Sequence, residues 1–173
     1  KDSRELYVSE KKFRHEKIVD NPTSQSDFFA KVVQVFGDNA KVGLCFYIAT
    51  LFRDIVIGKS RSFPILNAFG PKGCGKTEFA ATLMNFFYKY ETKYEPLSIT
   101  NASMPALSDY VGGVSDALVH IDEYKNSITQ NKVEWLKDLW NGIGRTKMNM
   151  DKDKKLVQAK VDSGIILTGQ EMP

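Results

Sequence analysis

Apolar residues recur along the chain in two rhythms, and the change from one to the other falls near Arg61. Before Arg61, apolar side chains follow the spacing of a helix face until Gly37, at Phe28, Phe29, Val32, Val33 and Phe36. A second helical pattern runs from about Val42 to Gly58, and it is apolar on so many sides that we expect neighbours on both flanks. Residues 24–58 are therefore predicted to form a small helical hairpin.

Beyond Arg61, short apolar runs alternate with helical patterns, which is typical of βαβ units around a parallel sheet. Four runs are predicted as strands: Phe63–Phe69, Pro96–Thr100, Ala117–Ile121 and Gly164–Thr168. Helical patterns lie between them at about Lys76–Tyr90, Met104–Val111 and Asn131–Asn141. We expect two parts, a charged N-terminal arm with the helical hairpin over residues 1–60 and an α/β core over residues 61–173.

Composition narrows the class of protein. The 173 residues are 42% hydrophobic and 26% charged, as in ordinary globular domains. No apolar run approaches the roughly 18 residues that cross a bilayer, so no membrane segment is expected. Two cysteines, Cys45 and Cys74, are too few for a disulfide framework or a four-ligand zinc site, which favours a cytoplasmic setting. Because the chain begins with Lys1 rather than Met, we interpret it as a fragment.

Charge is informative through its position. The net charge of +3 is too small to imply a nucleic-acid partner. Residues 145–160, however, carry six basic residues against two acidic ones, a local net charge of +4. The basic residues of this stretch are Arg145, Lys147, Lys152, Lys154, Lys155 and Lys160. A solvated charged loop and a phosphate-contacting surface are both compatible with this pattern.

A complete G-x-x-x-x-G-K-[ST] motif follows the first predicted strand and opens a predicted helix, at Gly70-Pro71-Lys72-Gly73-Cys74-Gly75-Lys76-Thr77. In this context Gly70, Gly73 and Gly75 let backbone N–H groups converge on phosphate oxygens, with Cys74 as a small residue between them. Lys76 would reach the β- and γ-phosphates, and the Thr77 hydroxyl would hold Mg²⁺. A tight turn without a ligand is the alternative, and the flanking strand and helix favour nucleotide binding.

Two adjacent carboxylates, Asp122 and Glu123, end the third predicted strand. Ligands of open α/β sheets bind at the carboxyl ends of the strands, so we expect these residues beside the glycine motif. There Asp122 would hold the Mg²⁺ shell and Glu123 would act as the base toward the attacking water. Alone, such a pair would indicate a loop start or a helix cap. His120, in the same strand, is interpreted as a hydrogen-bonded core histidine rather than a catalytic group.

Residues 62–173 resemble the additional-strand catalytic-glutamate (ASCE) branch of P-loop ATPases, which includes the AAA+ proteins. The resemblance rests on the glycine motif, on the strand that ends in Asp122-Glu123, and on the later strand that ends in Thr168-Gly169-Gln170. The resemblance implies a parallel P-loop sheet with flanking helices, ATP and Mg²⁺ as ligands, and catalytic roles for Lys76 and Glu123. It also implies a sensor role toward the γ-phosphate or the water for Thr168 or Gln170. That branch continues with a fifth strand and an arginine finger, so this chain alone is expected to hydrolyse ATP weakly or not at all.

A narrower resemblance rests on the order of four segments, Ile99–Ala102, Leu118–Glu123, Arg145–Lys160 and Ile165–Glu171. In this order the chain resembles the helicase modules of phage and mobile-element primase-helicases, which are similar to superfamily III helicases. This implies a hexameric ring whose basic β-hairpin grips single-stranded or forked DNA in the central pore. Here the hairpin strands would be Thr146–Met150 and Leu156–Val161, with Asp151–Lys154 as the turn. The candidate DNA contacts are Arg145, Lys147, Lys152, Lys154 and Lys155. The alternative function is a nucleotide-dependent AAA+ switch or assembly factor that acts on a protein partner without DNA.

Overall fold

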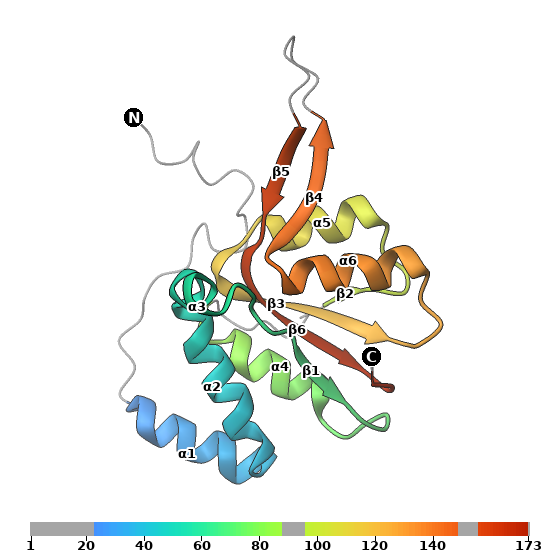
Figure 1. Cartoon of the computed structure of the whole chain (residues 1–173). Coiled ribbons are helices and arrows are strands. Elements are labelled where there is room, and N and C mark those ends of the chain that lie inside the picture. The colour runs from blue at the N-terminus through green and yellow to red at the C-terminus, as the bar shows by residue number, and fades with distance from the viewer. Residues whose placement is uncertain (1–22, 88–95, 149–155, 173) are drawn as a thin grey trace, which may run out of the picture.

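The computed structural model describes residues 23–87, 96–148 and 156–172, and its architecture is α/β (Figure 1). The four strands of its parallel sheet are β1 (Leu66–Phe69), β2 (Leu97–Ser98), β3 (Ser115–Tyr124) and β6 (Asp162–Gly169). They lie in the order β1-β6-β3-β2, so the last strand in sequence is inserted between β1 and β3. Consequently β6 is a central strand, and it is buried along nearly its whole length.

Two hydrophobic cores lie on opposite faces of the sheet, because successive side chains of a strand alternate between its faces. On one face, α5 (Met104–Gly112) and α6 (Gln130–Trp140) pack on Val119, Ile121 and Leu167. On the other face, α1 (Gln25–Phe36), α2 (Asn39–Leu51) and α4 (Lys76–Met84) pack on Leu118 and Ile166. We call this second side the α4 face.

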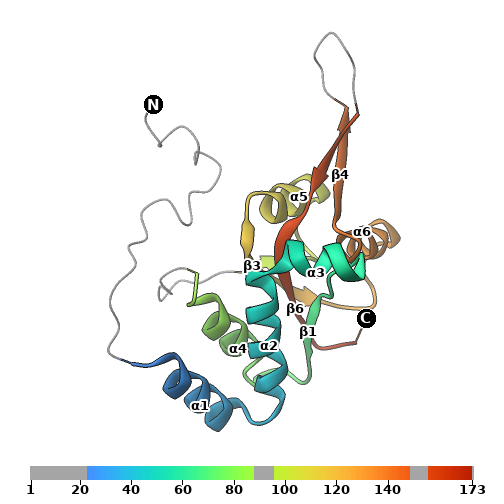
Figure 2. The same cartoon turned by 60° about the vertical axis from the view of Figure 1, so that its left-hand side comes forward.

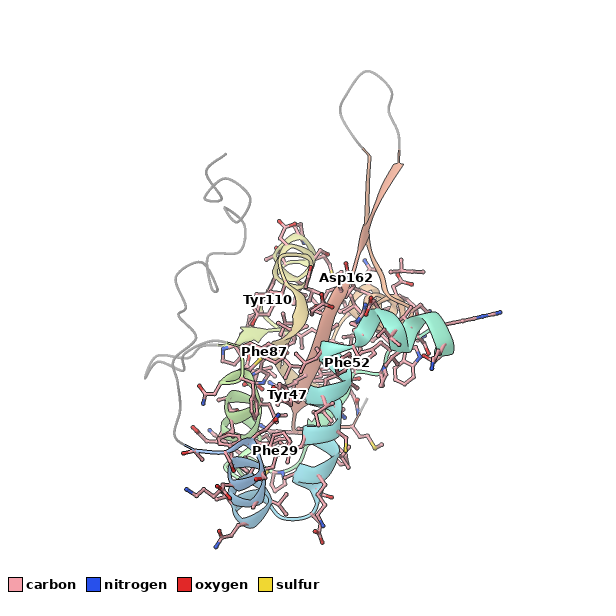
Figure 3. All side chains as sticks on the ribbon, turned by 90° about the vertical axis from the view of Figure 1, so that its left-hand side faces the viewer. Phe29, Tyr47, Phe52, Phe87, Tyr110 and Asp162 are labelled. Atoms are coloured by element: carbon pink, nitrogen blue, oxygen red, sulfur yellow. The ribbon has the colours of Figure 1, made fainter. Side chains whose placement is uncertain are left out.

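Aromatic side chains join α1 and α2 to the end of α4. The Tyr47 ring stacks on Phe86 with centroids 4.0 Å apart, and Phe87 meets Tyr47 edge-on at 5.5 Å. Phe29 approaches Tyr47 from α1 at 6.4 Å (Figure 3). The N-terminal helices therefore share a core with the sheet.

The second helix of the predicted hairpin is not continuous, and this part of the prediction is wrong. The backbone breaks at Phe52 (φ −121°, ψ 29°), and α3 (Arg53–Ser60) turns away from the axis of α2 (Figure 2). The turn brings Arg53 to 2% exposure, over the Phe63 ring at 5.3 Å and 3.8 Å from the Asp162 carboxylate. These partners are distant in sequence, so the local apolar pattern could not indicate the break.

The predicted strands all exist, with shifted ends. The first begins at Leu66 rather than Phe63, because the Phe63 N–H donates to the Trp140 carbonyl (3.0 Å) before the chain enters the sheet. The helix expected to reach Tyr90 ends at Met84, and residues 88–90 lie outside the described residues. The predicted N-terminal arm over residues 1–22 lies outside them as well. No helix in the described part of the chain has the length and apolar character to cross a bilayer.

A two-stranded antiparallel hairpin, β4 (Ile143–Met148) and β5 (Leu156–Lys160), precedes β6. It agrees with the predicted strand pair, although β4 begins three residues earlier, and the predicted turn at residues 151–154 lies outside the described residues. The two strands project from the body of the molecule (Figures 1 and 2). At their base, the Val161 N–H donates to the Gly142 carbonyl (3.3 Å), and Asp162 begins β6 (Figure 3).

Candidate active site

The carboxyl ends of β1, β3 and β6 lie at one edge of the sheet, because these strands are parallel. A cavity of about 310 Å³, which we call the strand-end cavity, opens there between the glycine motif and β3. It is lined by Lys72, Gly73, Lys76, Thr77, Asp122, Glu123, Tyr124, Lys125, Gly169 and Gln170. The structure thus brings together the four side chains expected to bind phosphate and metal and to act as base.

The glycine motif forms a tight loop between β1 and α4. Gly73 and Gly75 have φ of 82° and 86°, and Gly70 has φ of 152°, backbone conformations that favour glycine. A Cβ on Gly70 would also lie 3.2 Å from the Cys74 Sγ. The loop leads directly into α4, which begins at Lys76, so the positive end of this helix lies at the cavity.

The ammonium of Lys76 is folded over this loop. Its Nζ donates to the carbonyl oxygens of Gly70 (2.9 Å) and Pro71 (2.7 Å) and lies 3.6 Å from the Cys74 Sγ. Lys72 and Lys125 also line the cavity, so three ammonium groups meet two carboxylates there. Two of the three, Lys72 and Lys76, belong to the glycine motif, which suits a phosphate-bearing anion.

A β-bulge at the end of β3 shapes the acidic side of the cavity. Ile121 is opposite Leu167 and Tyr124 is opposite Gly169, so three steps along β3 correspond to two along β6. Glu123, at the bulge, has φ of 62°, a left-handed conformation that is costly for a non-glycine residue. In a regular strand the neighbours Asp122 and Glu123 would point to opposite faces, whereas here both line one cavity.

Residues at and after the end of β2 hold Glu123 in place. Its Oε2 accepts hydrogen bonds from the Ser98 hydroxyl and from the Asn101 amide (3.3 Å). Its backbone carbonyl accepts one from the Thr100 hydroxyl (2.7 Å). No other hydrogen bond to the carboxylate is formed by the described residues, so Oε1 is left to accept a proton from a ligand or a water.

Asp122 is held through one oxygen only. Its Oδ1 accepts hydrogen bonds from the Thr168 hydroxyl (2.5 Å) and from the Glu123 N–H (2.7 Å). The other oxygen, Oδ2, has no hydrogen-bond donor among the described residues. A carboxylate fixed in this way presents Oδ2 as a ligand for a cation.

The two candidate sensor residues occupy different places. Thr168 is fully buried and donates to Asp122 without lining the cavity, whereas Gln170 is exposed and lines it. A direct contact with a ligand is therefore available to Gln170, whereas Thr168 touches Asp122.

No family model matches this chain, and no curated protein matches it.

The oxygen-bearing side chains at the strand-end cavity suit Mg²⁺ better than a metal ion that takes all of its ligands from the protein. The described residues contain no group of three or more His, Cys, Asp or Glu side chains that could enclose a metal. Mg²⁺ usually takes one or two carboxylates and leaves its other positions to phosphates and water. Asp122 and Thr77, which both line the strand-end cavity, supply a carboxylate and a hydroxyl that fit that pattern.

A second cavity, of about 550 Å³, adjoins the glycine-rich loop on the helical side. It lies between the turn joining α1 to α2 and the outer edge of β1, and it reaches the loop at Cys74, Gly75 and Lys76. Its other walls are mostly apolar and include Phe36, Ala40, Val42 and Phe79. Such a hollow has the character of a pocket for a flat organic group.

The described part of the basic stretch belongs to β4 and β5. Arg145 and Lys147 are in β4, and the hairpin joins the amino end of β6, whereas the strand-end cavity is at its carboxyl end. Lys152, Lys154 and Lys155 lie outside the described residues. The backbone of Arg145 and Lys147 therefore belongs to a hairpin at the opposite end of β6 from the candidate nucleotide site.

Sequence reasoning missed Ser98, Asn101 and Lys125. Asn101 directly follows the predicted strand Pro96–Thr100, so the rule that ligands bind at strand ends could have singled it out with Asp122. Ser98 falls inside that predicted strand and Lys125 follows the acidic pair in a loop, where nothing in a single sequence distinguishes them from ordinary polar residues.

Proposed function

We propose that this chain is the ATP-binding and ATP-hydrolysing module of a DNA helicase or primase-helicase, a P-loop ATPase of the AAA+ and superfamily III type. The observation that carries the proposal is that Lys76 and Thr77 line the same cavity as Asp122 and Glu123, although the two motifs are far apart in sequence. A cation, a hydroxyl and two carboxylates at a helix N-terminus are the groups that phosphoryl transfer to water requires.

Each side chain has a role in this proposal. The loop N–H groups and the Lys76 ammonium bind the β- and γ-phosphates, for which Lys76 exchanges its present carbonyl partners. Thr77 and Asp122 Oδ2 hold Mg²⁺, which when bound neutralises charge on the phosphates. Glu123, anchored by Ser98 and Asn101 through Oε2, accepts the proton of the attacking water at Oε1.

The order of the strands supports the ASCE assignment. In that branch an additional strand separates the strand before the phosphate loop from the acidic strand. In this chain β6 is inserted between β1 and β3. A nucleoside would fit beside the loop, in the apolar cavity formed by Phe36 and Phe79 with their neighbours.

The DNA part of the proposal rests on the hairpin. A projecting antiparallel pair with a basic excess is a suitable phosphate-contacting arm, since Lys and Arg follow a DNA backbone without reading bases. In the hexameric ring of identical subunits that the resemblance implies, such arms would line one pore. A nucleotide-dependent switch that acts on a protein remains the alternative, and DNA binding distinguishes the two.

Calorimetric titration with ATP and Mg²⁺ tests the nucleotide site. Wild-type protein should bind, and Lys76→Ala should weaken binding at least about tenfold because a charge-assisted contact is lost. Lys31→Ala, at an exposed position of α1, is the matched control and should bind as the wild type does. Absence of binding by the wild type, or equal affinity in Lys76→Ala, would contradict the proposal.

A further inference from the structure

A chain of hydrogen bonds runs behind the strand-end cavity from His120 through Thr168 to Asp122. The His120 Nε2 lies 2.7 Å from the Thr168 Oγ1, which lies 2.5 Å from the Asp122 Oδ1. His120 and Thr168 are both fully buried. His120 and Leu118 share the α4 face by alternation, as do Thr168 and Ile166 on the neighbouring strand, so the chain is built into the sheet itself.

The direction of each hydrogen bond follows from the acceptors. A carboxylate oxygen carries no proton, so the 2.5 Å contact requires that the Thr168 hydroxyl donate to Asp122. Since that hydroxyl has one proton, Thr168 must accept from His120. The His120 ring therefore carries a proton on Nε2, and its partner is fixed without any ligand in the cavity.

We propose that His120 is a positioning residue that sets the metal-binding geometry of Asp122 through Thr168. The inference rests on the proposed function, because it assigns Mg²⁺ to Asp122 Oδ2. With Thr168 held as acceptor by His120, its proton points at Oδ1, and the Glu123 N–H supplies the second donor. Both donors on one oxygen fix the rotation of the carboxylate and leave Oδ2 directed to the ligand.

If His120 had a purely structural role, an apolar residue would serve equally well at its position. An apolar residue at position 120 would extend the packing of Leu118 and Ile166 without any polar group to satisfy. A buried imidazole, by contrast, costs free energy unless each polar atom finds a partner. The partners of His120 include Thr168, whose hydroxyl also donates to Asp122, so His120 acts on the site through a specific hydrogen bond and not through volume alone.

The test compares pairs of variants that keep or remove each hydrogen bond. Thr168→Val is isosteric and removes the hydroxyl, whereas Thr168→Ser keeps it. His120→Leu removes the donor at similar volume, whereas the amide of His120→Gln retains an N–H at a comparable reach. Calorimetric titrations with ATP at a series of Mg²⁺ concentrations, and with ATP in EDTA, separate the metal from the nucleotide.

Loss of a group behind a metal ligand typically weakens metal binding by about 10- to 100-fold. We expect Thr168→Val to raise the half-saturating Mg²⁺ concentration within this range, His120→Leu by about tenfold, and the two retaining variants by less than about threefold. Affinity for ATP in EDTA should be unchanged in all four. Should the wild type not bind ATP with Mg²⁺, both the proposed function and this inference fail. If the wild type binds and Thr168→Val shows unchanged Mg²⁺ dependence, the inference alone fails.

A spectroscopic readout is independent of the metal and of hydrolysis. The chain has two histidines, His15 and His120, so nitrogen-15 spectra of the imidazole rings can be assigned with the His120→Gln variant. We expect a proton on Nε2 of His120, with imidazole signals that shift in Thr168→Val and return in Thr168→Ser. A ring that carries no proton on Nε2 in the wild type would overturn the inference.

Discussion

Gly169 lies so close to Tyr124 that a Cβ on Gly169 would be 2.6 Å from the Tyr124 carbonyl oxygen. This approach joins β6 to β3 at the far side of the bulge, where the two strands resume their register. The acidic pair and Gln170 depend on it, because they lie on either side of this contact at the cavity. The geometry of the site therefore requires glycine at position 169, because a Cβ there would collide with the backbone of Tyr124.

Gly169→Ala should destabilise the protein by about 1–3 kcal/mol, the usual cost of overpacking, since the obstructing atom belongs to the backbone. Urea unfolding followed by circular dichroism measures this change. Gly58→Ala is the matched control: nothing lies within 4 Å of its Cβ, and the position is inside α3. It should be stabilising by up to about 1 kcal/mol through helix propensity. Equal effects of the two substitutions would contradict the close approach.

The left-handed backbone of Glu123 predicts an unusual order of stabilities. Glu123→Gly and Glu123→Ala both lose the hydrogen bonds to Ser98 and Asn101, but only Gly relieves the strain at φ 62°. The Gly variant should therefore be more stable than the Ala variant by about 1 kcal/mol. At Ser115, on the same strand and without a positive φ, Gly should be less stable than Ala by about 0.5–1 kcal/mol.

Glu123→Gln keeps the shape of the side chain and removes its capacity as a base. In the full-length ring, binding of ATP should persist, while hydrolysis should fall by about 10²- to 10⁴-fold, or about 3–5 kcal/mol. Glu78→Gln, in the first turn of α4, serves as the control and should hydrolyse at the wild-type rate. A wild-type rate in Glu123→Gln would assign the base to another residue.

Stability at alkaline pH should depend on Tyr47. Burial raises the pKa of its phenol above the ordinary value of 10.0. Above pH 10 the unfolded chain then loses this proton before the folded protein does, so the free energy of unfolding falls as pH rises. The contribution is at most about 1.4 kcal/mol per pH unit. Tyr47→Phe, which keeps the ring on Phe86, should lose stability less steeply between pH 9 and 11 in urea titrations.

DNA binding is tested by replacing Lys152, Lys154 and Lys155 together with Ala. Affinity for single-stranded DNA should fall similarly for unrelated sequences, and the slope of log affinity against log salt should flatten by up to about 2, at roughly 0.7 per lost phosphate contact. Replacement of Lys31, Lys41 and Lys59, all exposed on α1–α3, is the control. Wild-type affinity and slope in the hairpin variant would favour the protein-switch alternative.

Local patterns in the sequence were sufficient to locate the strands and the motifs, because strand rhythm and motif spacing are properties of neighbouring residues. They could not place β6 beside β1 or break the helix at Phe52, since both depend on residues distant in sequence, such as Arg53 and Asp162. The prediction of Asp122 and Glu123 at a strand end agrees with their position in the structure. The β-bulge that directs both side chains toward one cavity could not be predicted from the residue types at these positions.

The hairpin strand β5 continues through Val161 into β6, so a single stretch of backbone connects the projecting arm to the cavity. Within the sheet this stretch cannot slide, because β1 and β3 pair with it on both sides and a one-residue slip would invert its buried side chains. Displacement of the arm relative to the cavity is then limited to bending at its base, beside Gly142 (φ 72°) and the buried Arg53. A larger displacement of the hairpin therefore requires the sheet, and the cavity at its edge, to move together with it.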